Sequence, residues 1–182
     1  MLQKNTSGGV SKGLALTAMA ALLTLSPLGL DRLKQDEGLR TTPYRDQAGV
    51  LTVCYGDTQV NPNIRYSYKL CDEQLRSRVP AYEAVVRSLV TVPITQGQYD
   101  VLVNQVYQYG PRAFQGSTLL QKLNAGDCFG AAEEFSRWNK VRVNGKLTVN
   151  RGVQARAERR ARDFRLECRV WDAQASPSTG GA

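Results

Sequence analysis

The sequence predicts an α+β protein that is mainly helical, with an N-terminal hydrophobic helix, then a small β-rich lobe, then a larger helical lobe. Residues 13–30 carry no charge, and residues 44–58 are rich in strand-forming side chains between turn signals. From about residue 72, apolar residues recur at helical spacing. The 182 residues are enough for one ordinary domain with an appendage. We expect the binding site in a cleft between the two lobes.

Residues 13–30 predict a segment that inserts into a membrane only marginally. The run has 18 residues, at the lower edge of what spans a bilayer, and its small and polar residues weaken the contribution of seven leucines. Lys4 and Lys12 precede it, so we expect the N-terminus in the cytoplasm and the rest outside. A cleavable signal peptide, a permanent anchor and a helix that inserts and later leaves the membrane all remain open. All three interpretations predict export.

The β-rich lobe follows a short helix. We expect this helix over Asp31–Arg40, with Asp31 as its cap and Gly38 allowing it to end. The next residues favour a turn over 46–49 and a strand over 50–55, and residues 61–68 read as loop.

The helical lobe is predicted from apolar periodicity and capping signals. Pro80 is expected to kink or split the first helix, and Thr95 with Gln98 resembles a capping box at the start of the second. The expected helices cover residues 72–90, 95–108, 117–123, 127–138 and 151–171. Residues 172–182 read as a disordered tail.

The four cysteines suggest disulfides in an exported protein. They allow three pairings, and we expect Cys54–Cys71 and Cys128–Cys168 because each pair would close a local subdomain. Four reduced thiols are the alternative, and they suit a cytosolic protein better. With no histidine and no closely spaced cysteines, we expect no metal site and no cofactor.

The absence of histidine also limits the chemistry. It excludes a Ser-His-Asp hydrolase and a Cys-His peptidase, so carboxylates are the natural acids and bases. The formal charge of +8 indicates an anionic partner, such as a nucleic acid, a membrane surface or an acidic polymer.

Glu37, Asp46 and Thr52 are spaced so that a helix, a turn and a strand would carry them in order. This order can place one carboxyl group on each side of a cleft, as cleavage of an acetal requires. One carboxylic acid would protonate the departing oxygen, while the other carboxylate and the hydroxyl group would direct a water.

The same three residues, with their flanks, resemble the active-site signature of the T4-type phage lysozymes, glycoside hydrolase family 24. The flanks are EGLR, Pro-Tyr and AGVLTVCYGDT, and the similarity continues through VPITQGQYDVLVNQVYQYG, STLLQKLNAGD and Arg137-Trp138. It covers roughly residues 31–171 and implies a lysozyme-like fold. The N-terminal segment is similar to that of the signal-anchor-release endolysins in this family.

The resemblance implies a muramidase that hydrolyses the β-1,4 bond between N-acetylmuramic acid and N-acetylglucosamine in peptidoglycan, for host cell lysis. It implies Glu37 as general acid, Asp46 and Thr52 as the residues that handle the water, and an inverting reaction. The positions that match family residues near the sugar are Gly56, Gln108, Tyr109 and Gly110. For the two glycines, turn geometry explains their presence equally well.

The sequence departs from the family pattern in two places. Asp57 stands where members often carry a structural histidine, which concerns stability more than activity. The C-terminal arginine pattern is only partly met, by Arg151 and Arg156, so no arginine is assigned to the substrate.

Two other functions remain open. A lytic transglycosylase could work with Glu37 alone, whereas Asp46 and Thr52 are needed only if water attacks. A basic, non-catalytic module could instead bind wall, membrane or nucleic acid through the arginine-rich helix 151–171. Export and the lack of a nucleic-acid motif oppose a nucleic-acid partner, and surface charge alone explains most of these arginines.

The proximity of the hydrophobic segment to Glu37 suggests regulation. Only six residues separate Leu30 from Glu37, so we expect residues 1–30 to be a signal-anchor-release segment that holds the catalytic domain, residues 31–171, inactive at the host inner membrane. Family resemblance implies activation when a holin-type partner collapses the membrane potential and the enzyme, expected to be a monomer, is released into the periplasm. Residues 1–30 contain no cysteine, which excludes disulfide exchange with the anchor.

Overall fold

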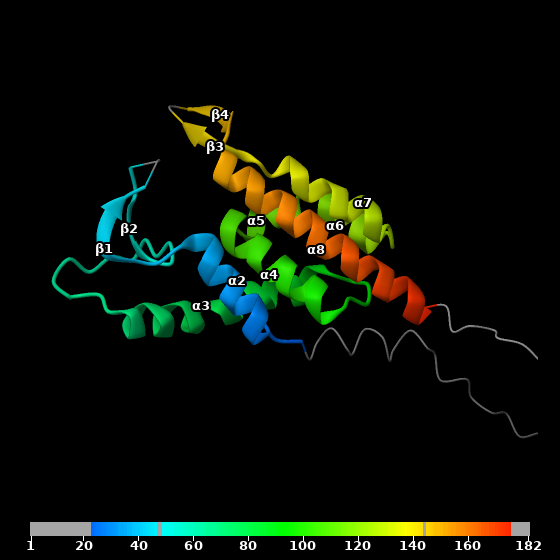
Figure 1. The fold of residues 1–182 in the computed structure, drawn as a ribbon, viewed down its shortest axis with the longest axis horizontal. Helices are drawn as coiled ribbons and strands as arrows, with labels where there is room; N and C mark the ends of the chain where they lie inside the picture. The colour runs from blue at the N-terminus through cyan, green and yellow to red at the C-terminus, as the bar shows by residue number, and fades with distance from the viewer. Residues whose placement is uncertain (1–22, 47–48, 144, 176–182) are drawn as a thin grey trace, which may run out of the picture.

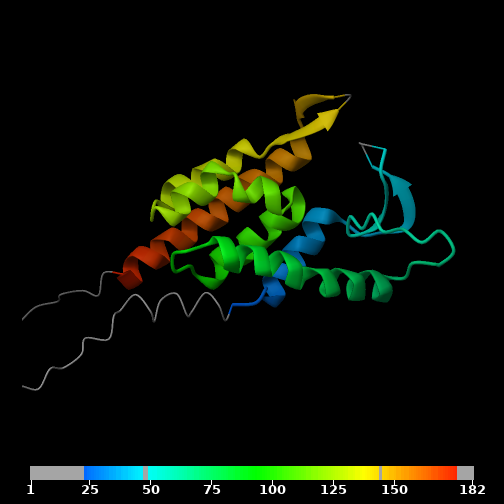
Figure 2. The ribbon, with the colours of Figure 1, turned by 180° about the vertical axis from the view of Figure 1, so that it is seen from behind.

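The computed structural model describes residues 23–46, 49–143 and 145–175 (Figure 1). Within the described residues the first helix is α2, Pro27–Glu37, and it leads directly into an antiparallel hairpin of β1, Arg40–Arg45, and β2, Leu51–Cys54. A loop then reaches α3, Tyr68–Leu89, which runs from the hairpin back to the other helices (Figure 2). These elements form the β-rich lobe and the long helix α3, which joins this lobe to the helical lobe.

The helical lobe is built around α4, Gln96–Tyr109, whose residues from Gln98 to Val106 are all buried. The remaining elements are α5 Pro111–Gln115, α6 Thr118–Asn124, α7 Cys128–Glu134, a 3-10 turn Phe135–Arg137, β3 Lys140–Val143, β4 Lys146–Val149 and α8 Arg151–Ala175. The long helix α8 lies along α4 and α7, and the β3–β4 hairpin stands at its N-terminal end (Figure 1). The predicted mainly helical α+β architecture is confirmed.

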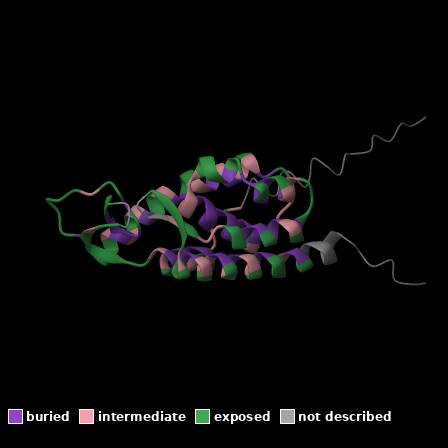
Figure 3. Ribbon diagram, turned by 90° about the horizontal axis from the view of Figure 1, so that it is seen from above, coloured by how far each residue is buried: buried purple, intermediate pink, exposed green. Residues whose placement is uncertain are grey.

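Two apolar clusters form the interior. The larger one surrounds α4 and includes Tyr99, Phe114, Phe135 and Phe164. The smaller one joins α2, β2 and α3, and includes Leu33 and Val53. Buried residues concentrate where the helices face one another, whereas β1 and the following loop are mainly exposed (Figure 3).

Each apolar cluster contains one disulfide. Cys54–Cys71 joins the end of β2 to α3, and Cys128–Cys168 joins α7 to α8. Both predicted pairings are confirmed.

The helix that carries Glu37 begins earlier than the sequence suggested. It starts at Pro27 rather than Asp31, because the Ser26 hydroxyl accepts a hydrogen bond from the backbone N–H of Gly29 at 3.0 Å and Pro27 suits the first helical turn. Asp31 is an exposed residue inside the helix rather than its cap. The helix ends at Glu37, and Gly38 adopts the positive φ that turns the chain into β1.

Several other boundaries differ from the predictions. Helix α3 starts at Tyr68 and continues through Pro80 without a break, because Pro80 is exposed and buried residues such as Val79 and Val86 hold the helix on both sides. The predicted helix 127–138 is α7 followed by a 3-10 turn. Helix α8 extends to Ala175, four residues into the stretch expected to be a tail.

The prediction missed α5 and the β3–β4 hairpin. The hairpin has clear local signals, because Asn144-Gly145 is a favoured hairpin turn and valines alternate with polar residues before it. Gly145 has a positive φ of 78°, which suits glycine at this turn.

The expected N-terminal helix and C-terminal tail lie mostly outside the described residues. Of the segment 13–30, only residues 23–30 are described, and they belong to the folded body. No helix within the described ranges is long and apolar enough to cross a membrane.

Candidate active site

Glu37 is the last residue of α2, where the helix meets the β-rich lobe. The side chains of Leu30 and Leu33 lie buried on the inner side of this helix, and their packing fixes the helix against β2 and α3. The next residue, Gly38, caps the helix with its N–H donated to the carbonyl of Lys34 at 3.0 Å. Local capping and apolar burial therefore place this carboxyl group at the junction of the lobes.

The carboxyl group of Glu37 is half-buried, and its Oε1 atom has no hydrogen-bond partner among the described residues. Burial raises the pKa of Glu37, because it penalises the charged form, and the positive charges of Arg156 and Arg160 oppose this rise. A carboxyl group with a raised pKa and an oxygen that accepts or donates no hydrogen bond is suited to act as a proton donor.

Arg160 connects α2, α4 and α8 behind Glu37. It is only 3% exposed, and its guanidinium donates hydrogen bonds to Asp36 at 2.8 Å, Gln105 at 3.2 Å and Gln108 at 2.5 Å. Asp36 also pairs with Arg159. These bonds fix the end of α2, and with it Glu37, against the helical lobe.

Arg160 was not among the site residues predicted from the sequence. It lies in line with the buried residues Val153, Ala157, Phe164 and Cys168, at helical spacing. That alignment was the available signal that this arginine points inward rather than to solvent.

Asp46 and Thr52 lie on the β1–β2 hairpin. Asp46 follows β1 and organises the turn, with its Oδ1 accepting the N–H of Val50 at 2.8 Å. Thr52 pairs with Tyr44 across the hairpin, is 4% exposed, and donates its hydroxyl to the carbonyl of Val50 at 3.0 Å. Val50 therefore links the turn that carries Asp46 to the strand that carries Thr52.

Gly56 lies next to Glu37. A side-chain carbon placed on Gly56 would be 3.4 Å from Oε2 of Glu37, and its φ of +81° favours glycine. The turn around it is closed by two hydrogen bonds of 2.8 Å between the backbones of Val53 and Asp57. The structure thus brings the loop after β2 to the carboxyl group at the end of α2.

Three contacts hold this loop in place. The Cys54–Cys71 disulfide and an ion pair of 2.8 Å between Asp57 and Arg78 connect it to α3. The Tyr107 hydroxyl, on α4, donates to the carbonyl of Tyr55 at 2.6 Å. Asp57, where the family resemblance implies a structural histidine, therefore forms an ion pair with α3.

Gln108, Tyr109 and Gly110 end α4, and each has an intramolecular role in the structure. Gln108 accepts the hydrogen bond from Arg160, while the Tyr109 hydroxyl donates to the carbonyl of Trp138 at 2.6 Å. Gly110 has a φ of 86° and separates α4 from α5. The Tyr109 and Trp138 rings pack against each other at a tilt of 58°, with centroids 4.6 Å apart, at one side of a groove of about 520 Å³.

Among the described residues, no group of three or more carboxylates and cysteines is arranged to hold a metal ion.

Comparison with known proteins places this chain in a family. Residues 34–162 match the family described as phage lysozyme. The chain is 39% identical over 138 residues to an endolysin of Acyrthosiphon pisum secondary endosymbiont phage 1, covering 74% of this chain and 92% of that protein. It is 45% identical over 105 residues to the SAR-endolysin of Escherichia phage Mu, covering 56% of this chain and 60% of that protein.

A solved structure supports the same assignment. The endolysin from Escherichia coli O157:H7 phage FAHEc1 superposes with a TM-score of 0.74 at 34% identity, covering 80% of this chain and 95% of that one. The chain belongs to the phage lysozyme family and is a lysozyme-type glycoside hydrolase.

Proposed function

We propose that this enzyme hydrolyses the β-1,4 bond between N-acetylmuramic acid and N-acetylglucosamine in peptidoglycan, with Glu37 as its general acid. The observation that carries this proposal is the half-buried Glu37 carboxyl group, with a raised pKa and an oxygen that has no partner among the described residues. Because its pKa is raised, this group keeps its proton to higher pH than an ordinary glutamate and can donate it to the departing sugar oxygen.

In the proposed reaction, Glu37 gives its proton to the glycosidic oxygen as the bond to the anomeric carbon breaks. Asp46 and the Thr52 hydroxyl direct a water to that carbon from the other side, and the water's proton passes to the Asp46 carboxylate. Arg156 and Arg160 stabilise the carboxylate that Glu37 becomes, because their charges favour its ionised form.

The test is digestion of purified peptidoglycan by the full-length chain and its Glu37→Gln variant, with mass spectrometry of the products. Glu73→Gln, an exposed change on α3, is the control. We expect reducing-end muramic acid from the parent and the control, and a loss of at least about a hundredfold in rate for Glu37→Gln. Anhydro-muramic acid would indicate a transglycosylase, and absence of cleavage by the parent would favour a binding module.

We also infer that residues 13–30 hold the enzyme inactive in the host inner membrane until collapse of the membrane potential, caused by a holin-type partner, releases it into the periplasm. The relative from Escherichia phage Mu is called a SAR-endolysin, which supports this inference. Helix α2, which carries Glu37, begins at Pro27 inside the predicted membrane segment. While that segment lies in the bilayer, α2 lacks its packing on β2 and α3.

Substitution of Gly13, Ala15, Ala18 and Ala20 by leucine tests the membrane hypothesis. These changes make the segment more apolar, so the enzyme should stay in the membrane longer and lysis should be delayed. Lysis at the same time as with the parent chain would contradict the hypothesis.

A further inference from the structure

Side chains of α3 and α4 hold the backbone of residues 23–26, a segment that we call the N-terminal strap. Arg87 donates to the carbonyl of Leu23 at 3.2 Å, and Gln96 donates to the carbonyl of Thr24 at 2.9 Å. The backbone N–H of Leu25 donates to Oε1 of Glu83 at 2.5 Å. The strap has no regular secondary structure, so these side chains provide hydrogen bonds that a helix or sheet would otherwise supply.

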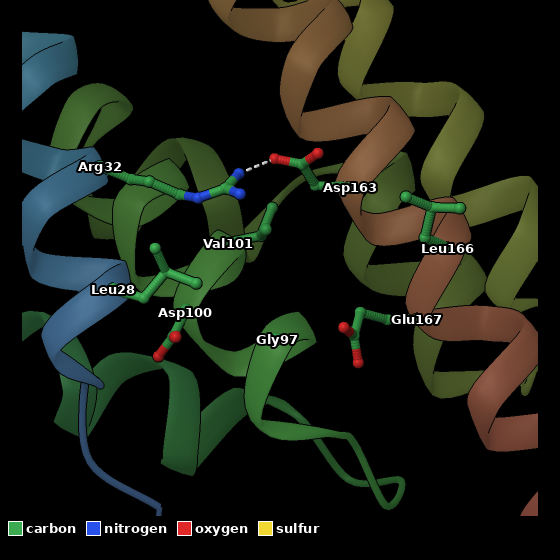
Figure 4. A pocket seen from close by; sticks show the side chains of 8 residues that line it. All are labelled: Leu28, Arg32, Gly97, Asp100, Val101, Asp163, Leu166 and Glu167. Carbon is green, nitrogen blue, oxygen red and sulfur yellow. Dashed lines mark hydrogen bonds and ion pairs between the residues drawn. The ribbon is translucent and has the colours of Figure 1, made fainter.

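Asp100 binds the last residue of the strap. Its carboxylate accepts the backbone N–H of Ser26 at 3.0 Å and the Ser26 hydroxyl. Gln96 also donates to Asp100 at 2.8 Å, which joins the two side chains. Figure 4 shows Asp100 on α4 beside Leu28 in the first turn of α2, which Ser26 caps.

The contact between α2 and Asp100 is close. A side-chain carbon at Gly29 would lie only 2.6 Å from Cγ of Asp100, so the first turn of α2 requires glycine there. Asn104, one turn further along α4, donates to the carbonyl of Gly29 at 3.3 Å. The start of α2 is therefore fitted to this part of α4.

The four residues that hold the strap, Glu83, Arg87, Gln96 and Asp100, form what we call the strap site. Glu83 and Asp100 are 6% and 7% exposed, and neither has a part in the proposed hydrolysis. Arg87 lies 3.7 Å from Glu83 and donates to the Tyr99 hydroxyl at 2.8 Å. Buried carboxylates need hydrogen-bond donors, and the strap supplies donors to both.

The strap cannot occupy this site and a membrane at the same time. When residues 23–30 belong to the body, the uncharged run 13–22 has ten residues, which would reach about 15 Å as a helix. The hydrocarbon core of a bilayer is about 30 Å thick. A membrane helix would also use the N–H groups of Leu25 and Ser26 for its own backbone bonds.

We propose that Glu83, Arg87, Gln96 and Asp100 form a binding site for the main chain of residues 23–26, and that filling this site favours the released form of the protein over the membrane-bound form. The proposal rests on the membrane anchoring inferred above. Because strap binding also places the Ser26 cap and the first turn of α2, it couples release from the membrane to the assembly of the helix that carries Glu37.

The test measures the ratio of released to membrane-bound full-length protein in Escherichia coli cells, before and after an uncoupler collapses the membrane potential. All chains carry Glu37→Gln, so that lysis does not interfere. Gln96→Ala and Asp100→Ala weaken the strap site, while Gln121→Ala on α6 and Glu73→Ala on α3 are matched exposed controls. Gln96 is itself exposed, so its variant should fold, and a thermal melt monitored by circular dichroism verifies this.

After uncoupling, we expect the released-to-bound ratio to fall about fivefold in Gln96→Ala and further in Asp100→Ala, with both controls like the parent. If Asp100→Ala does not fold, the released-to-bound ratio of Gln96→Ala alone tests the proposal. Release of a folded Gln96→Ala variant at the parent ratio would overturn the strap-site proposal and leave the anchoring intact. A parent chain that is never found in the membrane fraction would overturn the anchoring and, with it, this proposal.

Discussion

At Glu37, two opposing effects set the proton affinity. Burial raises the pKa of the carboxyl group, while Arg156 and Arg160 lower it. Arg160 is held by Asp36, Gln105 and Gln108, so it also fixes the protein around the acid. Arg156 is half-buried, has no such set of partners among the described contacts, and is therefore the better residue for testing charge alone.

Replacing Arg156 by glutamine should move the alkaline limb of the pH–activity profile to higher pH. The charge of Arg156 favours ionised Glu37, so its removal raises the pKa further and the acid keeps its proton to higher pH. The measurement is kcat/KM on peptidoglycan against pH. Arg162→Gln, an exposed change on α8, should leave the limb in place. An unmoved limb in Arg156→Gln would show that this charge does not act on Glu37.

The raised pKa of Glu37 also predicts a cost in stability. Ionisation is less favourable in the fold than in the unfolded chain, so the free energy of unfolding decreases as pH rises through the folded pKa of Glu37. Glu37→Gln should therefore raise the melting temperature of the full-length chain at neutral pH. The difference in melting temperature between Glu37→Gln and the parent should vanish at a pH below the ordinary glutamate pKa. An equal difference at both pH values would instead indicate a packing effect.

Among the elements, α4 positions the loop that follows β2. Tyr107 points from α4 to the carbonyl of Tyr55, and its ring packs on Tyr82 of α3 with centroids 4.8 Å apart. The loop it holds places Gly56 beside Glu37. A helix of the larger lobe thus determines how closely the smaller lobe covers the acid.

Tyr107→Phe should lower kcat about threefold to tenfold with a smaller change in KM. It removes one hydrogen bond, keeps the ring contact and lets the loop move away from Glu37. Water then reaches the carboxyl group, its pKa falls toward the ordinary value, and the alkaline limb moves to lower pH. Tyr82→Phe is the matched control on α3. Normal kcat and an unchanged limb in Tyr107→Phe would contradict a positioning role for this hydroxyl.

Across the whole molecule, each apolar cluster has its own disulfide, but only one of them borders the site. Cys54–Cys71 spans 17 residues and holds the loop beside Glu37. Cys128–Cys168 spans 40 residues and joins α7 to α8 in the larger cluster. Loop-closure entropy assigns about 3 kcal/mol to the first and about 4 kcal/mol to the second.

Paired cysteine-to-alanine variants should separate stability from activity. Removing Cys128 and Cys168 should decrease the free energy of unfolding by about 4 kcal/mol, with little change in the activity of the folded enzyme. Removing Cys54 and Cys71 should decrease it by about 3 kcal/mol and also lower activity, because the loop carrying Gly56 loses its connection to α3. Denaturant unfolding and peptidoglycan hydrolysis measure the two effects. If the two cysteine-pair variants hydrolysed peptidoglycan at the same rate, the Cys54–Cys71 disulfide would have no role in positioning the site.

The sequence by itself determined the features that depend on local patterns. Helical spacing and capping residues predicted α4 with its Thr95 capping box, and alternation and turn signals predicted the β-rich lobe. Sequence spacing also predicted both disulfides. The order of Glu37, Asp46 and Thr52 predicted a helix end, a turn and a strand, which is where these residues lie.

Only the tertiary structure decided which groups far apart in sequence meet. It placed Arg160 behind Glu37, Tyr107 against the loop at Gly56, and residues 23–26 in a site made by α3 and α4. The structure also shows that α2 starts at Pro27. The residues just before it were predicted to insert into a membrane, but in the structure buried carboxylates from two other helices bind them. Periodicity shows which side of an element is apolar, but the partner of a buried charge depends on how complete elements pack.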